Sequence, residues 1–141
     1  MAKRLGNDYR LFVRGTDGTA FEQPAGQGNL TKNGGKAFTS NATKDTEGYD
    51  TQSPGLKTLT LSQQLTPSLP DPQGYTRMET LDQSNEAEVY QIRKKPFASA
   101  DVVFEALMYT GLDNTEFNQG ESVKVGVTLT LAEAPTVNTL S

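Results

Sequence analysis

The side chains that most often perform chemistry in proteins are missing from this sequence. Its 141 residues contain no histidine and no cysteine. Without histidine, Ser-His-Asp and Cys-His catalysis is excluded, together with the commonest general base at neutral pH. Without cysteine there is no disulfide framework and no thiolate zinc site, which fits folding in a reducing compartment. The composition therefore disfavours an enzyme.

Two glycine-containing segments approach nucleotide-binding motifs and fail at defining positions. In NGGKA at 33–37, Leu30 stands where a phosphate-binding loop needs its first glycine, and Ala37 replaces the Ser or Thr that binds magnesium. The GQG at 26–28 is followed by Thr31 where the dinucleotide fingerprint requires glycine. We discard both motifs and interpret these segments as loops.

The acidic residues suggest no clear catalytic or metal site either. Asp45, Glu47 and Asp50 lie close together in the sequence, but without the spacing of a calcium-binding loop. A solvated arm explains them better, and no carboxylate pair lies in a recognisable glycosidase context. We therefore expect no cofactor and no metal.

The charge balance restricts the partners. There are 13 Lys and Arg against 17 Asp and Glu, which gives a net charge of −4 and a pI near 4.8. This balance argues against general affinity for nucleic acid or anionic membranes, since phosphate binding needs a basic surface. The basic N-terminus at Lys3 and Arg4 is followed by no apolar run that would suit a signal peptide, and no segment approaches a membrane span. We expect synthesis and use in the cytoplasm, or release with something assembled there.

Hydrophobic alternation predicts a mainly β protein. In Glu121–Leu131, valines and leucines alternate with Lys, Gly and Thr, which indicates a strand with one buried face. Related patterns predict further strands at Asp8–Arg14 with a return over Thr19–Glu22, at Leu56–Leu65, at Glu88–Lys95 and at Asp101–Thr110. Gly111–Gly120 should link the last of these to the C-terminal strand. The length suits one domain over residues 1–141.

Three segments interrupt the strand pattern. The polar residues 23–54 cannot supply a core, so we expect a short strand near Ala37–Thr43 and a projecting arm over Lys44–Ser53, with a disordered loop as the alternative. Asp71 as N-cap and Pro72 at the first position predict a helix over 72–84, with Tyr75, Met78 and Leu81 on its buried side. Residues 132–141 suit a flexible or partner-bound tail.

Two sets of residues are candidate contact surfaces. The strand over Asp101–Thr110 is apolar on both sides, so a neighbouring subunit could cover the side that carries Val103, Leu107 and Tyr109. The cluster Arg93, Lys94 and Lys95 is either a solvated edge or a patch that meets acidic neighbours.

The order of these features resembles the major tail protein, or tail tube protein, of long non-contractile-tailed phages and gene transfer agents. The resemblance is carried by DYRLFVR at 8–14, FEQPAGQ at 21–27, the polar arm with Thr43 and Asp45, PGLKTLTLS at 54–62 and the closing VGVTLTL at 125–131. It extends over nearly the whole chain as a set of small motifs. Tyr49 stands where members of this family commonly have an aromatic residue in the arm, whereas Glu133-Ala134-Pro135 replaces the family's usual glycine-rich finish.

The resemblance implies a two-sheet β-sandwich or partly closed barrel with one flanking α-helix and a long projecting loop. It further implies hexameric rings stacked head to tail around a β-lined lumen that conducts DNA, in a virion tail, beside a tape measure, a tail terminator and a distal tail protein. DNA would be cargo that does not adhere, and no membrane would be involved. On this hypothesis the inter-ring contacts lie in the arm, at Lys44, Asp45, Glu47, Tyr49, Asp50 and Thr51. The alternative from another class is a soluble β-sandwich binding module, such as a carbohydrate- or receptor-binding virion domain, although the absence of tryptophan weakens sugar stacking.

Overall fold

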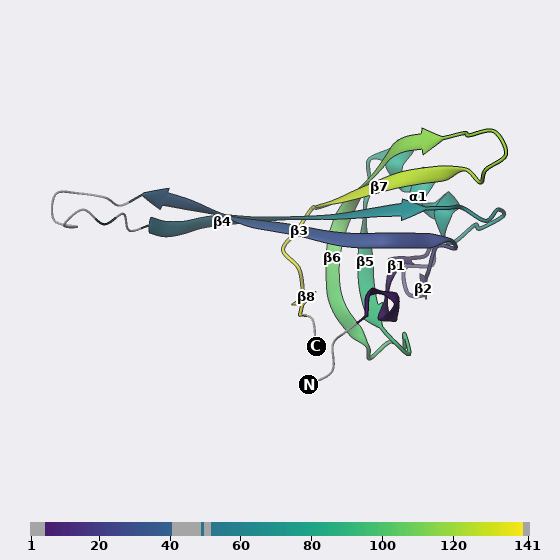
Figure 1. Ribbon diagram of the computed structural model, residues 1–141. Helices are drawn as coiled ribbons and strands as arrows, with labels where there is room; N and C mark the ends of the chain where they lie inside the picture. Colours follow the sequence, from purple (N-terminus) through teal and green to yellow (C-terminus); the bar gives the residue numbers. More distant parts are fainter. Residues whose placement is uncertain (1–4, 41–48, 50–51, 140–141) are drawn as a thin grey trace.

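The computed structural model describes residues 5–40, 49 and 52–139, and shows a mainly β protein with one α-helix (Figure 1). A short 3-10 helix, η1 (Gly6–Asp8), is followed by strands and the helix in the order β1 (Tyr9–Arg14), β2 (Phe21–Glu22), β3 (Gln27–Ser40), β4 (Gln52–Leu65), α1 (Tyr75–Ser84), β5 (Ala87–Lys94), β6 (Val102–Glu116), β7 (Lys124–Leu131) and β8 (Val137–Asn138).

All eight strands belong to one antiparallel sheet in the order β2-β1-β5-β6-β7-β4-β3, with β8 paired to β6. The long strand β6 makes this possible because its first half pairs with β5 and its second half pairs with β7. Figure 1 shows β7, β4 and β3 running across β5 and β1, so the sheet is folded into two layers. The expected mainly β fold with one helix is confirmed, but its two layers are parts of one continuous sheet that does not close into a barrel.

The core lies between the two layers and α1. Its fully buried side chains come from both layers and the helix, and include Leu11, Leu61, Leu65, Met78, Leu81, Tyr90, Phe104, Met108, Val125 and Leu129. The predicted apolar side of the last strand is confirmed at Val125, Val127 and Leu129, whereas Val123 precedes β7 and is 38% exposed. Period-two alternation thus located the strands that build the core.

The strand boundaries differ from the prediction where two strands support each other. β3 starts at Gln27 instead of near Ala37, β4 starts at Gln52 instead of Leu56, and β6 continues to Glu116 through the predicted connection. The glycine-rich 33–37 therefore lies inside a strand. Backbone pairing across a hairpin does not require apolar side chains, so composition alone missed these extensions.

The helix begins three residues later than predicted. Residues 72–74 form turns and α1 starts at Tyr75, where the backbone N–H of Tyr75 donates to Asp71 Oδ2 at 3.1 Å. Asp71 therefore still satisfies a donor at the helix start, although it is not the N-cap residue. The predicted buried stripe of Tyr75, Met78 and Leu81 is confirmed. No helix in the described residues has the length and apolar character needed to cross a bilayer.

Contacts at the start of β3 connect it to β1 and to the end of β4. Gln27 donates from Nε2 to the Leu11 carbonyl at 2.7 Å and accepts the Leu11 N–H at 2.9 Å, so its side chain pairs with the edge of β1 as a strand would. Gly26 has φ +74° and a Cβ there would lie 1.8 Å from the Thr66 carbonyl oxygen, so only glycine fits. These contacts fix the position where β3 leaves the body.

The C-terminal segment lies against the chain's own sheet. Thr136 and Thr139 donate backbone N–H groups to the carbonyls of Glu105 and Val103, and β8 pairs with Phe104 and Glu105. Within the tail predicted for 132–141, residues 136–139 thus lie along β6 of the same chain, and the expected flexible or partner-bound role stays a prediction. This segment occupies the edge of β6 that β7 does not reach, where β6 would otherwise present unpaired backbone groups.

Candidate assembly surfaces

The β3–β4 hairpin projects from the body as an arm (Figure 1). Among the described residues, only Thr60–Leu65 of β4 pair with β7, whereas the preceding part of β4 pairs with β3. At the usual rise per strand residue, this preceding part extends roughly 25 Å from the body. A projecting arm was predicted, but its shaft is a regular hairpin that starts well before Lys44. Of the predicted arm contacts, Tyr49 is 76% exposed. Lys44, Asp45, Glu47, Asp50 and Thr51 lie outside the described residues.

The two faces of this hairpin carry different chemistry. One face, which we call the hydroxyl face, pairs Thr31 with Ser62, Asn33 with Thr60 and Gly35 with Thr58, and continues onto β7 at Thr128 and Thr130. The other, the lysine face, pairs Leu30 with Gln63, Lys32 with Leu61, Gly34 with Leu59 and Lys36 with Lys57. Strand alternation sends these two sets of side chains to opposite sides.

The hydroxyl face is polar and nearly uncharged. Its hydroxyl and amide groups cover the outer side of the β3-β4-β7 layer, and at its far end Asp113, Glu116 and Lys124 bring two negative charges and one positive charge. There the hydroxyl of Thr128 donates to the Asp113 carboxylate. This face gives a polynucleotide few cations to bind.

The lysine face borders an open hollow at the root of the arm. The hollow measures about 790 Å³ and lies between Gly34, Leu59 and the C-terminal segment Leu131–Pro135. Lys36 and Lys57 stand on its rim together with Glu133. Lys32 lies nearer the body, where its Nζ donates to Asn138 Oδ1 at 2.8 Å and sits 5.8 Å from the centre of the Phe104 ring.

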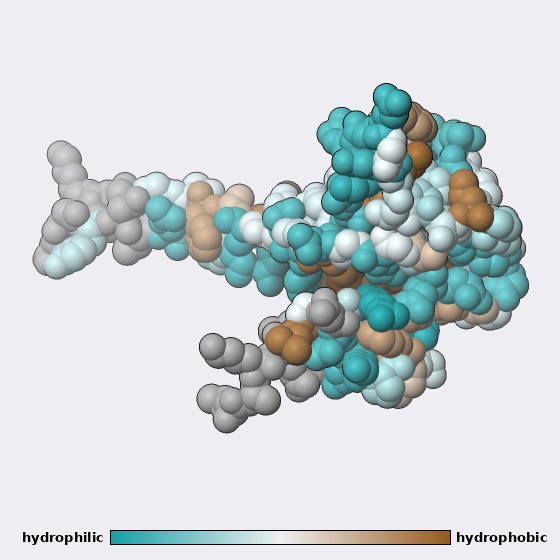
Figure 2. All heavy atoms as spheres, turned by 45° about the vertical axis from the view of Figure 1, so that its right-hand side comes forward, coloured by the Kyte–Doolittle hydropathy of each residue, from teal (hydrophilic) through white to brown (hydrophobic). Residues whose placement is uncertain are grey.

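Hydrophobic side chains are exposed at both ends of the molecule. Figure 2 shows a mostly hydrophilic arm with an apolar patch along it, and Phe38 and Leu56 of the arm are 58% and 84% exposed. At the other end, the turn between β6 and β7 exposes 79% of Phe117. No contact residue was predicted in this turn, although Phe117 is an aromatic residue among polar ones and so indicated a contact.

The predicted basic cluster is divided in the structure. Arg93 lies on the outer side of β5, where its guanidinium stacks 4.6 Å from the Phe12 ring centre and donates to Phe97 O. Lys94 is the register partner of Tyr9 and follows the alternation to the other side, and Lys95 comes after the strand and is exposed. The three side chains therefore do not form one patch, and their predicted role at an interface stays a prediction.

The predicted subunit-facing side of β6 is also divided. Val103 is only 3% exposed, because a register shift between Ile92 and Arg93 leaves it as an extra residue of β6 that packs in the core. Leu107 is half-buried beside the C-terminal segment, whose Ala132 N–H donates to the Leu107 carbonyl. Tyr109 is 50% exposed. Of the three candidates, Tyr109 is the most available for a contact with another copy.

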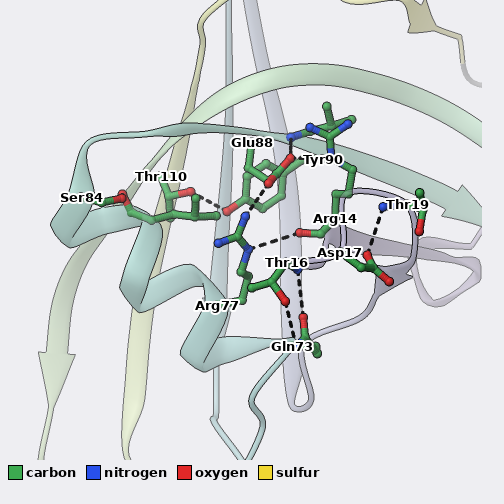
Figure 3. Close-up of polar contacts among 12 residues, drawn as sticks. Arg14, Thr16, Asp17, Thr19, Gln73, Arg77, Ser84, Glu88, Tyr90 and Thr110 are labelled. Carbon is green, nitrogen blue, oxygen red and sulfur yellow. Dashed lines mark hydrogen bonds and ion pairs between the residues drawn. The ribbon is translucent and has the colours of Figure 1, made fainter.

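A buried ion-pair group fixes α1 to the sheet (Figure 3). Glu88 accepts from Arg14 Nε at 2.7 Å through one oxygen and from Arg77 of α1 through the other. Its side chain is 8% exposed. Nearby, Tyr90 and Thr110 share a buried hydrogen bond, and burial raises the pKa of Tyr90 above the ordinary tyrosine value. These polar contacts stabilise the body and leave the arm untouched.

The sequence matches no protein-family model and no curated protein. Solved structures with the same fold are nevertheless found. A chain in the tail of an empty gene transfer agent particle with C6 symmetry superposes with a TM-score of 0.79 at 12% identity, covering 96% of this chain and 99% of that one. A chain from the virion of a native gene transfer agent gives 0.76 at 12% identity over 94% and 97%. The SPP1 tail tube gives 0.68 at 10% identity over 96% and 80%.

These similarities establish the class of fold. The chain has the fold of subunits found in phage and gene transfer agent tails, as the resemblance in the sequence predicted. The similarity covers 94–96% of the chain.

Proposed function

We propose that this chain is a structural subunit of a phage or phage-like tail tube. Subunits form rings, six to a ring, and the rings stack head to tail around a lumen that conducts DNA. The observation that carries the proposal is the whole-chain similarity to tail proteins at 10–12% identity, among them one in a tail of C6 symmetry. The sheet edge supports it, because Pro54–Leu59 of β4 pair with β3 and with no other strand among the described residues, and such edges favour pairing with another chain.

The lumen is lined by the hydroxyl face of the β3-β4-β7 layer. Each Lys or Arg that meets a phosphate adds a favourable counterion-release term, and many identical subunits multiply every such contact. The hydroxyl face is nearly uncharged, whereas Arg10, Arg14 and Arg93 lie on β1 and β5. In this arrangement DNA slides past hydroxyl and amide groups without adhering.

Other components complete the assembly. A tape measure lies in the lumen before ejection, a terminator closes one end of the tube and a distal tail protein the other. The subunit is made in the host cytoplasm and ends in the virion tail. The arm reaches the adjacent ring, so removal of Lys44–Ser53 should spare single rings and abolish long tubes.

Electron microscopy of the purified protein at high concentration tests the proposal directly. Rings or tubes are expected. If sedimentation showed a strict monomer at every concentration, including with the other tail components present, the proposal would be overturned and a monomeric binding module favoured.

Lysine substitutions test the lumen assignment. Tubes of the native chain should bind no duplex DNA even at low salt, where attraction is strongest. Thr60→Lys tubes should retain DNA, with an affinity that falls steeply as salt rises. Gln83→Lys adds the same charge on the exposed side of α1 and serves as the control. Equal retention by both variants would contradict the assignment of the hydroxyl face to the bore.

A further inference from the structure

Lys36 and Lys57 are the register partners of a cross-strand pair on the lysine face. Like charges directly opposite each other on one face of a hairpin destabilise it. The body has a comparable pair, Arg10 opposite Arg93, but there aromatic rings cover the guanidinium groups: Phe97 lies 4.8 Å from Arg10 and Phe12 lies 4.6 Å from Arg93. The two ion pairs among the described residues both go to Glu88, so neither lysine of the arm has a carboxylate partner there.

The hollow beside this lysine pair is open and partly apolar. Leu59, Leu131, Ala134 and Pro135 contribute apolar surface, and Gly34 keeps the hollow wide because it has no side chain. Glu133 also lines the hollow, so the two lysines leave one positive charge in excess, which suits a partner that combines an exposed apolar side chain with a carboxylate.

The turn between β6 and β7 of the same chain has this composition. Its residues 117–123 contain Glu121 and no lysine or arginine, whereas Glu116 ends β6 and is the register partner of Lys124. Phe117 is 79% exposed in this turn, and Val123 is 38% exposed. Figure 1 shows the turn on the side of the body opposite to the arm, so a turn and a hollow on one molecule cannot meet.

We propose that the β6–β7 turn of one copy inserts Phe117 into the hollow at the arm root of a second copy, with Glu121 against Lys36 and Lys57. The contact is heterologous, because the turn and the hollow are different surfaces on opposite sides of the molecule. Such a contact can repeat from one copy to the next. This inference rests on the proposed function, in which it supplies a contact between stacked rings in addition to the arm.

Disulfide trapping tests the contact without altering Phe117 or the charges. The chain has no cysteine, so Gln119→Cys in the turn and Ala134→Cys at the hollow introduce the only thiols. Under oxidation, the variant with both cysteines should give a ladder of covalent oligomers, because each copy links to the next. Either single variant should stop at dimers. Gln119→Cys combined with Leu5→Cys, which is exposed near the N-terminus, is the matched control and should give no ladder.

Charge reversal tests the chemistry. Lys36→Glu with Lys57→Glu should abolish tubes, as should Glu121→Lys, whereas the three changes combined should restore them. If native protein forms tubes while the double-cysteine variant gives no ladder and the reversals have no effect, this inference is wrong and the proposed function stands. If native protein forms no tubes under any condition, the proposed function itself fails.

Discussion

The two ends of β4 lie in different environments. At one end, Leu61 and Leu65 are 1% and 0% exposed and pack in the core. At the other, Leu56 of the same strand is 84% exposed. Backbone pairing with β3 continues through both regions. Strand pairing in the arm therefore satisfies the backbone, whereas the side chains of the arm contribute to stability only when a partner covers them.

The same substitution at two phenylalanines sharpens this comparison, and its effect should be the largest. Phe104 is 1% exposed, so Phe104→Ala should lower the free energy of unfolding by about 3–5 kcal/mol through lost burial and a cavity. Phe38 on the arm is 58% exposed, so Phe38→Ala should change it by less than about 0.5 kcal/mol. Urea denaturation of both variants measures the difference. Similar losses would mean that the arm packs against the body.

Removal of a charge should have opposite effects in the two regions. Glu88→Gln leaves Arg14 and Arg77 without their carboxylate partner, and should cost about 2 kcal/mol, less than a fully buried pair because the side chain of Arg14 is 34% exposed. Lys36→Gln removes one of two facing cations and should leave stability unchanged or raise it by up to about 0.5 kcal/mol. A clear loss with Lys36→Gln would show that this lysine has a partner within the isolated chain.

The root of the arm should be sensitive to a smaller change. Gln27→Ala removes the side-chain amide that bonds both backbone groups of Leu11, which should cost about 1–2 kcal/mol. Gln64→Ala, on the exposed side of β4, is the matched control and should stay within about 0.5 kcal/mol of the native chain. Hydrogen exchange at Leu11 should also accelerate in Gln27→Ala only. Unchanged protection at Leu11 would argue that the amide is dispensable.

The smallest effect concerns pH. Burial raises the pKa of Tyr90 above its ordinary value of 10.0, so the unfolded chain releases this proton at lower pH than the folded chain does. The stabilising contribution is therefore fully present below pH 10 and is lost as the pH rises further. In Tyr90→Phe, the decline of stability above pH 10 should be shallower than in the native chain, with a loss of about 1 kcal/mol near neutrality from the Thr110 hydrogen bond. Identical alkaline slopes would contradict the assignment.

Sequence alone determined the parts of the fold whose side chains carry the signal. Alternation located the strands β1, β4, β5 and β7 and the buried side of β7, and helical spacing placed Tyr75, Met78 and Leu81. These patterns could not predict the extensions of β3 and β6 or the strand at Val137–Asn138, because these elements depend on backbone pairing with segments distant in the sequence. β-propensity depends on a residue and its neighbours in the sequence, and it does not show which distant strand will pair with that residue.

The tertiary structure alone decided which candidate residues share a surface. The strand separates the side chains of Arg93, Lys94 and Lys95, although these residues are adjacent in the sequence. Val103 is not on the predicted contact side, because a register shift in β6 places it in the core. Conversely, Lys36 and Lys57 face each other only through the register of the arm. The sequence determined the absence of histidine and cysteine chemistry and the amphipathic strands, because residue type and spacing suffice for these. Faces, hollows and facing charges depend on register, which long-range pairing sets.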